Sequence, residues 1–204
     1  MFQATGVILA GGKSVRMGVD KAFLPIGNEV MIERAAGEIG KVCAEVLIAG
    51  GSAAAGQRLG LPVVPDLIAG CGPLGGIHAA LHAASYELIL VVACDMPFVS
   101  PELAALLLER AKGYDAAVPR HGAYLEPLFA VYRKTCLPAI EASLGSFRRK
   151  VADFYPHVLV NYVDEENWCA IADAGKVFLN VNTLQDLDRA RKMLGPEKLG
   201  RRLP

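Results

Sequence analysis

The segment Leu88-Ile89-Leu90-Val91-Val92-Ala93-Cys94-Asp95-Met96-Pro97 decides the fold class of this 204-residue chain. Its first six residues form an unbroken apolar run, which is typical of a strand that is buried on both faces of a parallel sheet. Asp95 follows soon after the run ends. Similar short apolar runs occur at residues 6–10, 46–49, 62–65 and 115–119. Helical patterns separate these runs, so the sequence predicts an α/β protein with three layers: a mostly parallel sheet and helices on both of its faces.

The ends of two helices can also be located from the sequence. Ser100 predicts the N-cap of one helix, and Gly113 predicts its end. Thr183, with Asp186 three residues later, predicts the start of a last helix that ends at Gly195. These signals support the alternation of strands and helices.

The length of the chain favours one domain rather than several. We expect residues 1–195 to form this domain and residues 196–204 to be a flexible tail. The stretch 124–131 interrupts the alternation, and it predicts either an antiparallel strand or an inserted lobe.

The composition excludes several classes of protein. Hydrophobic residues make up 53% of the chain and charged residues 21%, which excludes intrinsic disorder. The 21 basic residues balance 21 acidic ones, so the basic excess of a nucleic-acid-binding protein is missing. The apolar runs are too short to cross a bilayer, and the first residues do not resemble a secretory signal. The five cysteines are scattered, which predicts neither disulfides nor a zinc site. We therefore expect a cytoplasmic protein that binds neither nucleic acid nor membrane.

The loop after the first strand reads Leu9-Ala10-Gly11-Gly12-Lys13-Ser14-Val15-Arg16-Met17-Gly18-Val19-Asp20-Lys21. Its glycines allow the backbone to approach a ligand closely and to direct N–H groups at anionic oxygens. Lys13, Arg16 and Lys21 add positive charge, so the loop is chemically suited to a triphosphate. Gly18 is not followed by Lys-Ser/Thr as in Walker A, and the dinucleotide fingerprint GxGxxG is also absent.

Four segments together resemble the molybdenum cofactor guanylyltransferase (MobA) family of nucleotidyltransferases, which have a Rossmann-like, glycosyltransferase-A-like α/β fold. The segments are Leu-Ala-Gly-Gly at 9–12 with Arg-Met-Gly at 16–18 and Asp-Lys at 20–21, Asp66 followed by Gly-Pro-Leu-Gly-Gly at 72–76, Ala-Cys-Asp-Met-Pro-Phe at 93–98, and Asn-Val-Asn-Thr at 180–183. The resemblance extends in order over nearly the whole chain, and the joint occurrence of the segments makes it specific.

The resemblance implies transfer of GMP from GTP to the terminal phosphate of molybdenum-molybdopterin. The products would be a guanine dinucleotide cofactor and pyrophosphate, and the reaction would depend on Mg²⁺. It implies a nucleotide-binding half at about 1–120 and an acceptor-side half at about 121–195. Other proteins of molybdenum cofactor synthesis and the recipient molybdoenzymes are the expected protein partners.

The resemblance also implies roles for particular residues. Leu9, Ala10, Gly11 and Gly12 would hold the nucleotide together with Asp66. In the catalytic set, Asp95 would bind both Mg²⁺ and the nucleotide, while Lys21 and Arg16 would screen the triphosphate and the departing pyrophosphate. Residues 49–51 read Ala-Gly-Gly where many relatives have an asparagine, so that nucleotide contact is either missing here or made by the backbone alone.

The acceptor side rests on weaker patterns. Asn180 belongs to the segment that resembles the family, and Asn182 would complete the metal or pterin site or shape the turn before the last helix. Arg148 begins a run of three basic residues that, with Arg120 and His121, is a candidate for binding the pterin phosphate. A run of charges is more often a solvated face.

The proposed chemistry brings an anionic phosphate to an anionic α-phosphate, so positioning and charge neutralisation are its main requirements. No protein nucleophile is needed, and the sequence contains no evident Ser-His-Asp or Cys-His arrangement. His78 and His82 are four residues apart on a predicted helix, but no HExxH motif accompanies them. The spacing of the histidines therefore does not compel a metal site.

Three alternatives remain open. A cytidylyltransferase for the same cofactor is the nearest, but its relatives usually read Leu-Ala-Ala-Gly and CDQP where this chain has Gly11 and Met96. A sugar-phosphate nucleotidyltransferase is the second, although such chains are commonly longer. A nucleotide-binding adaptor without activity is the third, and the presence of Asp95 and Lys21 argues against it.

Overall fold

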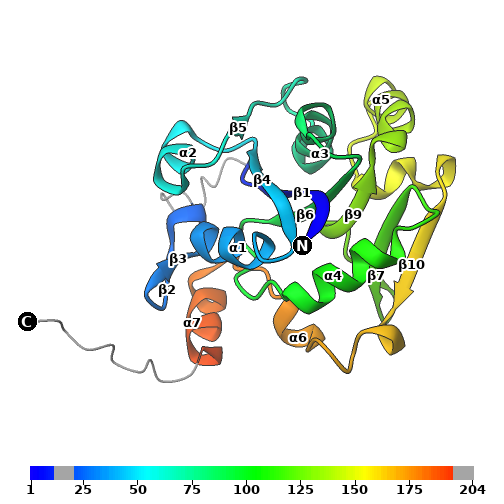
Figure 1. Ribbon diagram of the computed structural model, residues 1–204. Helices are drawn as coiled ribbons and strands as arrows, with labels where there is room; N and C mark the ends of the chain where they lie inside the picture. Colours follow the sequence, from blue (N-terminus) through cyan, green and yellow to red (C-terminus); the bar gives the residue numbers. More distant parts are fainter. Residues whose placement is uncertain (12–20, 195–204) are drawn as a thin grey trace, which may run out of the picture.

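A computed structural model describes residues 1–11 and 21–194 of the protein (Figure 1). The strands of the main sheet are β1 (Phe2–Leu9), β4 (Cys43–Ala49), β5 (Val63–Val64), β6 (Leu88–Ala93), β7 (Ala116–His121), β8 (Tyr124–Leu125), β9 (Phe129–Arg133) and β10 (Val160–Asp164). Their order is β10-β7-β9-β6-β1-β4-β5, and β8 pairs with the edge of β7. Two short strands, β2 (Pro25–Ile26) and β3 (Glu29–Val30), form a separate hairpin.

The helices are α1 (Met31–Ile39), α2 (Ala53–Leu59), α3 (Gly72–Ala83), α4 (Pro101–Arg110), α5 (Leu137–Gly145), α6 (Ala174–Val177) and α7 (Leu184–Met193). Short 3-10 turns occur at η2 (Lys21–Phe23), η3 (Lys134–Cys136), η4 (Val151–His157) and η5 (Glu165–Asn167). Both predicted helix starts are confirmed. The hydroxyl of Ser100 accepts a bond of 3.1 Å from the Leu103 amide. The Thr183 hydroxyl accepts a bond of 3.1 Å from the Asp186 amide. The carboxylate of Asp186 in turn accepts a bond from the Thr183 amide.

The predicted parallel sheet is confirmed for its central part, where β6, β1, β4 and β5 run parallel to one another. The stretch 124–131 contributes antiparallel strands rather than an inserted lobe. β9 runs antiparallel to β6 on one side and to β7 on the other, and β10 is parallel to β7. The sheet is therefore mixed, because one reversed strand joins its two parallel parts.

Alternate residues of the central strands enter two different cores. In β1, Ile8 packs with α1 and α4 on one face, while Val7 and Leu9 pack with α3 and α5 on the other. Figure 1 shows α1 and α4 on one side of the sheet and α3 on the other. Both faces are thus buried, which is why these strands are apolar at every position instead of alternating.

A third, smaller core joins distant parts of the chain. Leu24 and Ile26, in and near the β2–β3 hairpin, pack with Phe98, Val181 and Leu187. This core holds α7 against the hairpin, as Figure 1 shows below α1.

The register of the sheet brings the ends of three strands together. Leu9 at the end of β1 pairs with Ala49 of β4 and with Ala93 of β6. Residues that follow these strands therefore lie at one edge, where open α/β sheets bind their ligands.

Within residues 1–11 and 21–194, no helix is long and apolar enough to cross a membrane.

Candidate active site

Two glycines meet backbone to backbone where β1 and β4 end. Gly50 has a φ of +70°, a left-handed conformation that favours glycine. A Cβ atom at Gly50 would lie 3.0 Å from the Cα atom of Gly11 and 3.2 Å from its nitrogen. The amide of Gly50 donates a bond of 2.9 Å to the carbonyl of Val64, which fixes this conformation. The missing asparagine after the second strand is thus replaced by a turn in which only backbone fits against Gly11.

Asp66 lies at the same glycines. Its Oδ1 atom would be 3.3 Å from a Cβ atom at Gly50 and 4.0 Å from one at Gly76. Gly76 belongs to α3 and in turn lies against Leu9, since a Cβ atom there would approach the Leu9 Cδ2 atom to 3.0 Å. Leu9, Gly11 and Asp66 therefore line one cradle, together with Gly50 and Gly76. The sequence motifs predicted the first three of these residues.

The segment 70–76 is only partly the bend that its glycines suggest. Gly70 and Gly72 have positive φ values of 74° and 59°, so the chain turns sharply there. Residues 72–76 then form the first turns of α3 instead of a loop. Pro73 fits this position because the first turn of a helix does not use its missing N–H.

We expect Gly50→Ala to damage the cradle more than a glycine substitution with the same backbone strain elsewhere. Gly60 also has a positive φ, of 65°, but a Cβ atom there meets nothing within 4 Å. Both alanine variants incur the left-handed strain of about 1–2 kcal/mol. Gly50→Ala adds the backbone collision with Gly11, which should lower the free energy of unfolding by about 1–3 kcal/mol more. Denaturant unfolding and the Kd for a nucleoside triphosphate measure the two effects, and equal losses in both variants would contradict the close approach.

Asp95 is held rigidly beside the cradle. The Cys94 amide donates to the Leu9 carbonyl at 3.0 Å, which extends the pairing of β6 with β1. The Asp95 carbonyl accepts a bond of 2.9 Å from the amide of Val181, which is fully buried in the third core. The backbone of Asp95 is therefore fixed from both sides, while its side chain is half-buried at the edge of the sheet.

Lys21 and Asn182 complete the group around Asp95. The Lys21 Nζ atom donates a bond of 2.8 Å to the Asn182 Oδ1 atom, across 161 positions of sequence. Burial raises the pKa of the Asp95 carboxyl above its ordinary value, and the positive charge of Lys21 opposes this rise. The structure thus brings together three of the predicted residues, two of which interact electrostatically.

The residues around Asp95 fit a divalent cation. A carboxylate whose pKa is raised by burial lacks sufficient compensation for its charge, and a cation would supply it. Mg²⁺ binds through one or two carboxylates and completes its coordination with water and phosphate oxygens. Asp95 would hold the ion, and the Asn182 side-chain oxygen is the next oxygen donor in the group.

Other predicted residues are not part of this group or are not placed. Gly12 and Arg16 lie outside the described residues. Asn180 donates from Nδ2 to the Phe178 carbonyl at 3.3 Å, so it stabilises the turn before α7. Arg148 is exposed, whereas its neighbour Arg149 donates from Nη1 to the Gly70 carbonyl at 2.9 Å. The sequence run did not indicate which arginine reaches the bend before α3.

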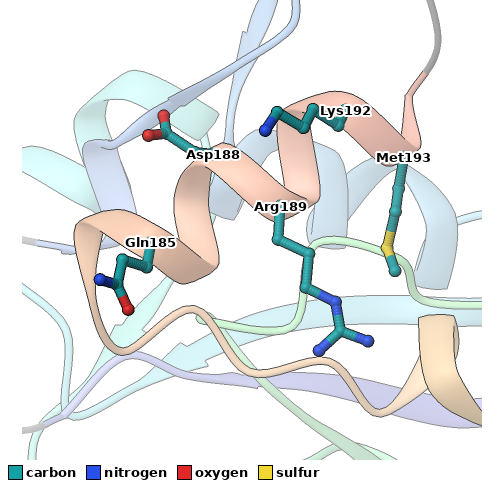
Figure 2. A pocket seen from close by; sticks show the side chains of 5 residues that line it. All are labelled: Gln185, Asp188, Arg189, Lys192 and Met193. Carbon is teal, nitrogen blue, oxygen red and sulfur yellow. The ribbon is translucent and has the colours of Figure 1, made fainter.

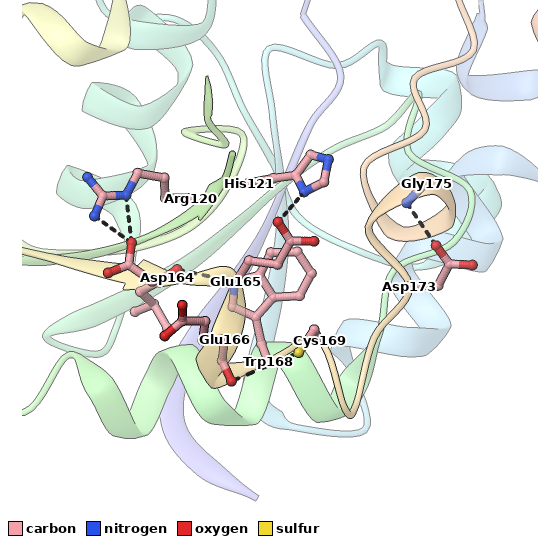
Figure 3. A network of polar contacts seen from close by, with 10 residues as sticks. Arg120, His121, Asp164, Glu165, Glu166, Trp168, Cys169, Asp173 and Gly175 are labelled. Atoms are coloured by element: carbon pink, nitrogen blue, oxygen red, sulfur yellow. Dashed lines mark hydrogen bonds and ion pairs between the residues drawn. The ribbon is translucent and has the colours of Figure 1, made fainter. Parts of the chain in front are cut away.

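Arg120 and His121 lie at the end of β7, not in a loop, and both face carboxylates (Figure 3). Arg120 bonds to Asp164 of β10 at 2.6 Å, and His121 Nδ1 lies 2.9 Å from Glu165. These acidic partners offset the charge that the sequence analysis assigned to phosphate binding.

The described part of the surface includes hollows on α7 and beside β7 and β10, and no predicted nucleotide or metal residue lines either of these. Figure 2 shows the first, on α7, lined by Gln185, Asp188, Arg189, Lys192 and Met193. The second is lined by Arg120, Gly122, Asp164, Glu165, Glu166 and Cys169.

A parallel-stranded α/β core with a glycine cradle, a lysine and an edge carboxylate defines a protein of the nucleotidyltransferase class. The sequence profile of the MobA-like NTP transferase domain matches residues 6–158. The chain belongs to this family.

Sequence similarity to relatives of this family extends over almost the whole chain. A probable molybdenum cofactor guanylyltransferase of Pelotomaculum thermopropionicum is 60% identical over 201 residues, which is 98% of this chain and 98% of the relative. Another, of Carboxydothermus hydrogenoformans, is 36% identical and covers 95% of this chain and 98% of its own. The crystal structure of molybdopterin-guanine dinucleotide biosynthesis protein A from Archaeoglobus fulgidus superimposes with a TM-score of 0.80 at 28% identity, and covers 93% of this chain and 98% of that one.

Proposed function

We propose that this protein transfers GMP from GTP to molybdenum-molybdopterin and releases pyrophosphate. The observation that carries the proposal is the grouping of Lys21, Asn182 and Asp95 beside the Gly11–Gly50 cradle. The names of the relatives, molybdenum cofactor guanylyltransferase, support the choice of both substrates. Nucleotide-binding residues are proposed at Leu9, Ala10, Gly11, Gly12 and Asp66, and catalytic residues at Arg16, Lys21 and Asp95.

The chain's own residues act by binding and by neutralising charge. The backbone of Gly11 and Gly50 accepts the nucleotide closely because neither residue has a side chain in the way. Lys21 is held by Asn182, so its ammonium group is already oriented when the triphosphate arrives. A preorganised cation of this kind stabilises charge that develops on the departing pyrophosphate. A Mg²⁺ ion bound at Asp95 would supply further neutralisation of the phosphate oxygens.

No residue is required to activate the incoming group. The attacking oxygen belongs to a phosphate monoester, whose second pKa is about 6, so it is largely deprotonated near neutral pH. Asp95, which interacts electrostatically with Lys21, is thus not needed as a general base. Asp95 is therefore assigned to cation binding and not to proton abstraction.

The acceptor side is proposed to lie in residues 121–195, and the nucleotide side in residues 1–120. Asn182 supports this division because it approaches Lys21 from the segment before α7. Asn180 and Arg148 remain candidates for contact with the pterin substrate. The reaction is proposed to take place in the cytoplasm, where the cofactor would pass to recipient molybdoenzymes.

A nucleotide panel tests the proposed substrate. The purified protein, given Mg²⁺ and molybdenum-molybdopterin, is incubated separately with GTP, CTP, ATP and UTP, and pyrophosphate release is measured. We expect release to be fastest with GTP and to require the pterin. Fastest release with CTP would replace guanine by cytosine and leave the transfer chemistry in place. Nucleotide binding without pyrophosphate release under any condition would favour an adaptor.

A further inference from the structure

A second cluster of potential metal ligands joins α3 to α5, on the face of the sheet that these helices cover. It consists of the Nε2 atoms of His78 and His82, both on α3, and the Oε1 atom of Glu141 on α5. The two nitrogens are 3.2 Å apart, and they lie 3.5 Å and 3.4 Å from the Glu141 oxygen. The histidines are one helical turn apart, so their rings project from the same side of α3.

Hydrogen bonds alone do not account for this triangle. Each ring nitrogen carries at most one proton, and that proton lies in the ring plane and points to one acceptor. The shared Oε1 atom and two facing nitrogens therefore leave at least one edge without a well-directed bond. The buried Nδ1 atom of His78 has no hydrogen-bond partner among the described residues, whereas its Nε2 atom faces both His82 and Glu141.

The spacing fits a tetrahedral ion instead. Zinc binds histidine nitrogen and carboxylate oxygen at about 2.0–2.2 Å, so two ligands of a tetrahedral site lie about 3.3–3.6 Å apart. The three observed separations of 3.2, 3.4 and 3.5 Å match one face of such a tetrahedron. A small ion can therefore enter with little movement of the side chains.

The ligand types select the kind of metal. Two imidazoles and one carboxylate suit Zn²⁺ and its neighbours Co²⁺ and Ni²⁺, whereas Mg²⁺ prefers an all-oxygen site. His78 is 5% exposed and anchors the cluster, while His82 and Glu141 reach solvent. Solvent access leaves the fourth position to water and gives the ion a path of entry.

We propose that His78, His82 and Glu141 bind one Zn²⁺-class ion that ties α3 to α5. This inference is independent of the proposed transfer reaction. The ion would steady the segment that leads into α3, because Arg149, just beyond α5, already donates to the Gly70 carbonyl before α3. The metal would thus add a further link between two helices that already pack against each other in the core.

Metal titration of the whole protein tests the proposal. Protein freed of metal with a chelator and then dialysed is titrated with Co²⁺, followed by visible absorption, and with Zn²⁺ in competition with a chromophoric chelator. We expect one tight site with the Co²⁺ spectrum of nitrogen and oxygen ligands. His82→Gln and Glu141→Gln, both at exposed positions, should each weaken Zn²⁺ binding at least about tenfold. Zn²⁺ should also raise the Tm of the unsubstituted protein more than that of either variant.

Matched controls exclude other ligands. His157→Gln removes another exposed histidine, and Cys169→Ser removes the exposed thiol, and neither should change the affinity. Circular dichroism establishes that the variants are folded, and Glu141→Gln still decides the test if His82→Gln is not. The proposal is overturned if Zn²⁺ binds both ligand variants as tightly as the unsubstituted protein. It is equally overturned if the Co²⁺ spectrum shows thiolate charge transfer that Cys169→Ser abolishes.

Discussion

Asp95→Asn is expected to lower the rate of pyrophosphate release from GTP by about 10³-fold, the effect of removing a main electrostatic contributor to the transition state. The amide keeps the size of the side chain and can still accept a hydrogen bond, but it has no charge to hold a divalent cation. The loss should appear at saturating GTP and should not be restored by moderate increases in Mg²⁺. Asp188→Asn on α7 is the matched control, because this exposed carboxylate lies outside the group around Lys21.

The same substitution should not destabilise the unliganded protein. Burial raises the pKa of Asp95, so as the pH rises the carboxyl of the unfolded chain loses its proton first, near its ordinary pKa of about 3.9. Stability is lost from that pH upward until the raised pKa of the folded state is passed. Asparagine removes this cost, so the Tm of the variant at pH 7 should equal or exceed that of the original protein. Near-normal turnover, or inactivity that accompanies unfolding, would contradict the assignment of Asp95.

Lys21→Met is expected to lower kcat/KM for GTP by about 10²-fold, as expected for one preorganised cation at the phosphates. The nearly isosteric chain keeps its apolar contacts but loses the bond to Asn182. Lys41→Met is the control, because Lys41 is an exposed lysine whose ion pair with Glu38, at 2.6 Å, lies outside the group around Asp95. Initial rates over a range of GTP concentrations measure the effect.

The pH profile of Lys21→Met separates an electrostatic role from a structural one. Lys21 holds the pKa of Asp95 lower than burial alone would set it. Its removal should therefore move the acid limb of the kcat/KM profile to higher pH. An unchanged limb together with reduced turnover would mean that Lys21 does not act on Asp95.

The central strands and their edge residues could be predicted because the relevant signals are local. Residues 88–93 are apolar at every position because both faces of β6 are buried. Asp95 lies at the edge of the sheet because it comes two residues after the end of this strand. The starts of α4 and α7 depend on a cap hydroxyl that accepts from the backbone amide three residues later, so Ser100 and Thr183 were sufficient.

Contacts between distant segments could not be predicted in this way. The bond between Lys21 and Asn182 spans 161 positions, and Glu141 is 59 positions from His82. Only the packing of α7 on the hairpin, and of α5 on α3, brings these pairs together. The histidine pair alone carried no metal signal because its third ligand comes from a different helix.

Residues 180–183 complete the site, and this has a consequence for synthesis on the ribosome. The amide of Val181 and the side chain of Asn182 reach Asp95 and Lys21 from a segment made after every strand of the sheet. A nascent chain that ends just after β10 contains every strand of the sheet. It still lacks the Asn182 side chain, which holds Lys21 in the finished protein. The proposed active site can therefore form only after residues 180–183 have been synthesised. Incomplete translation products that can still fold their core are not expected to consume GTP.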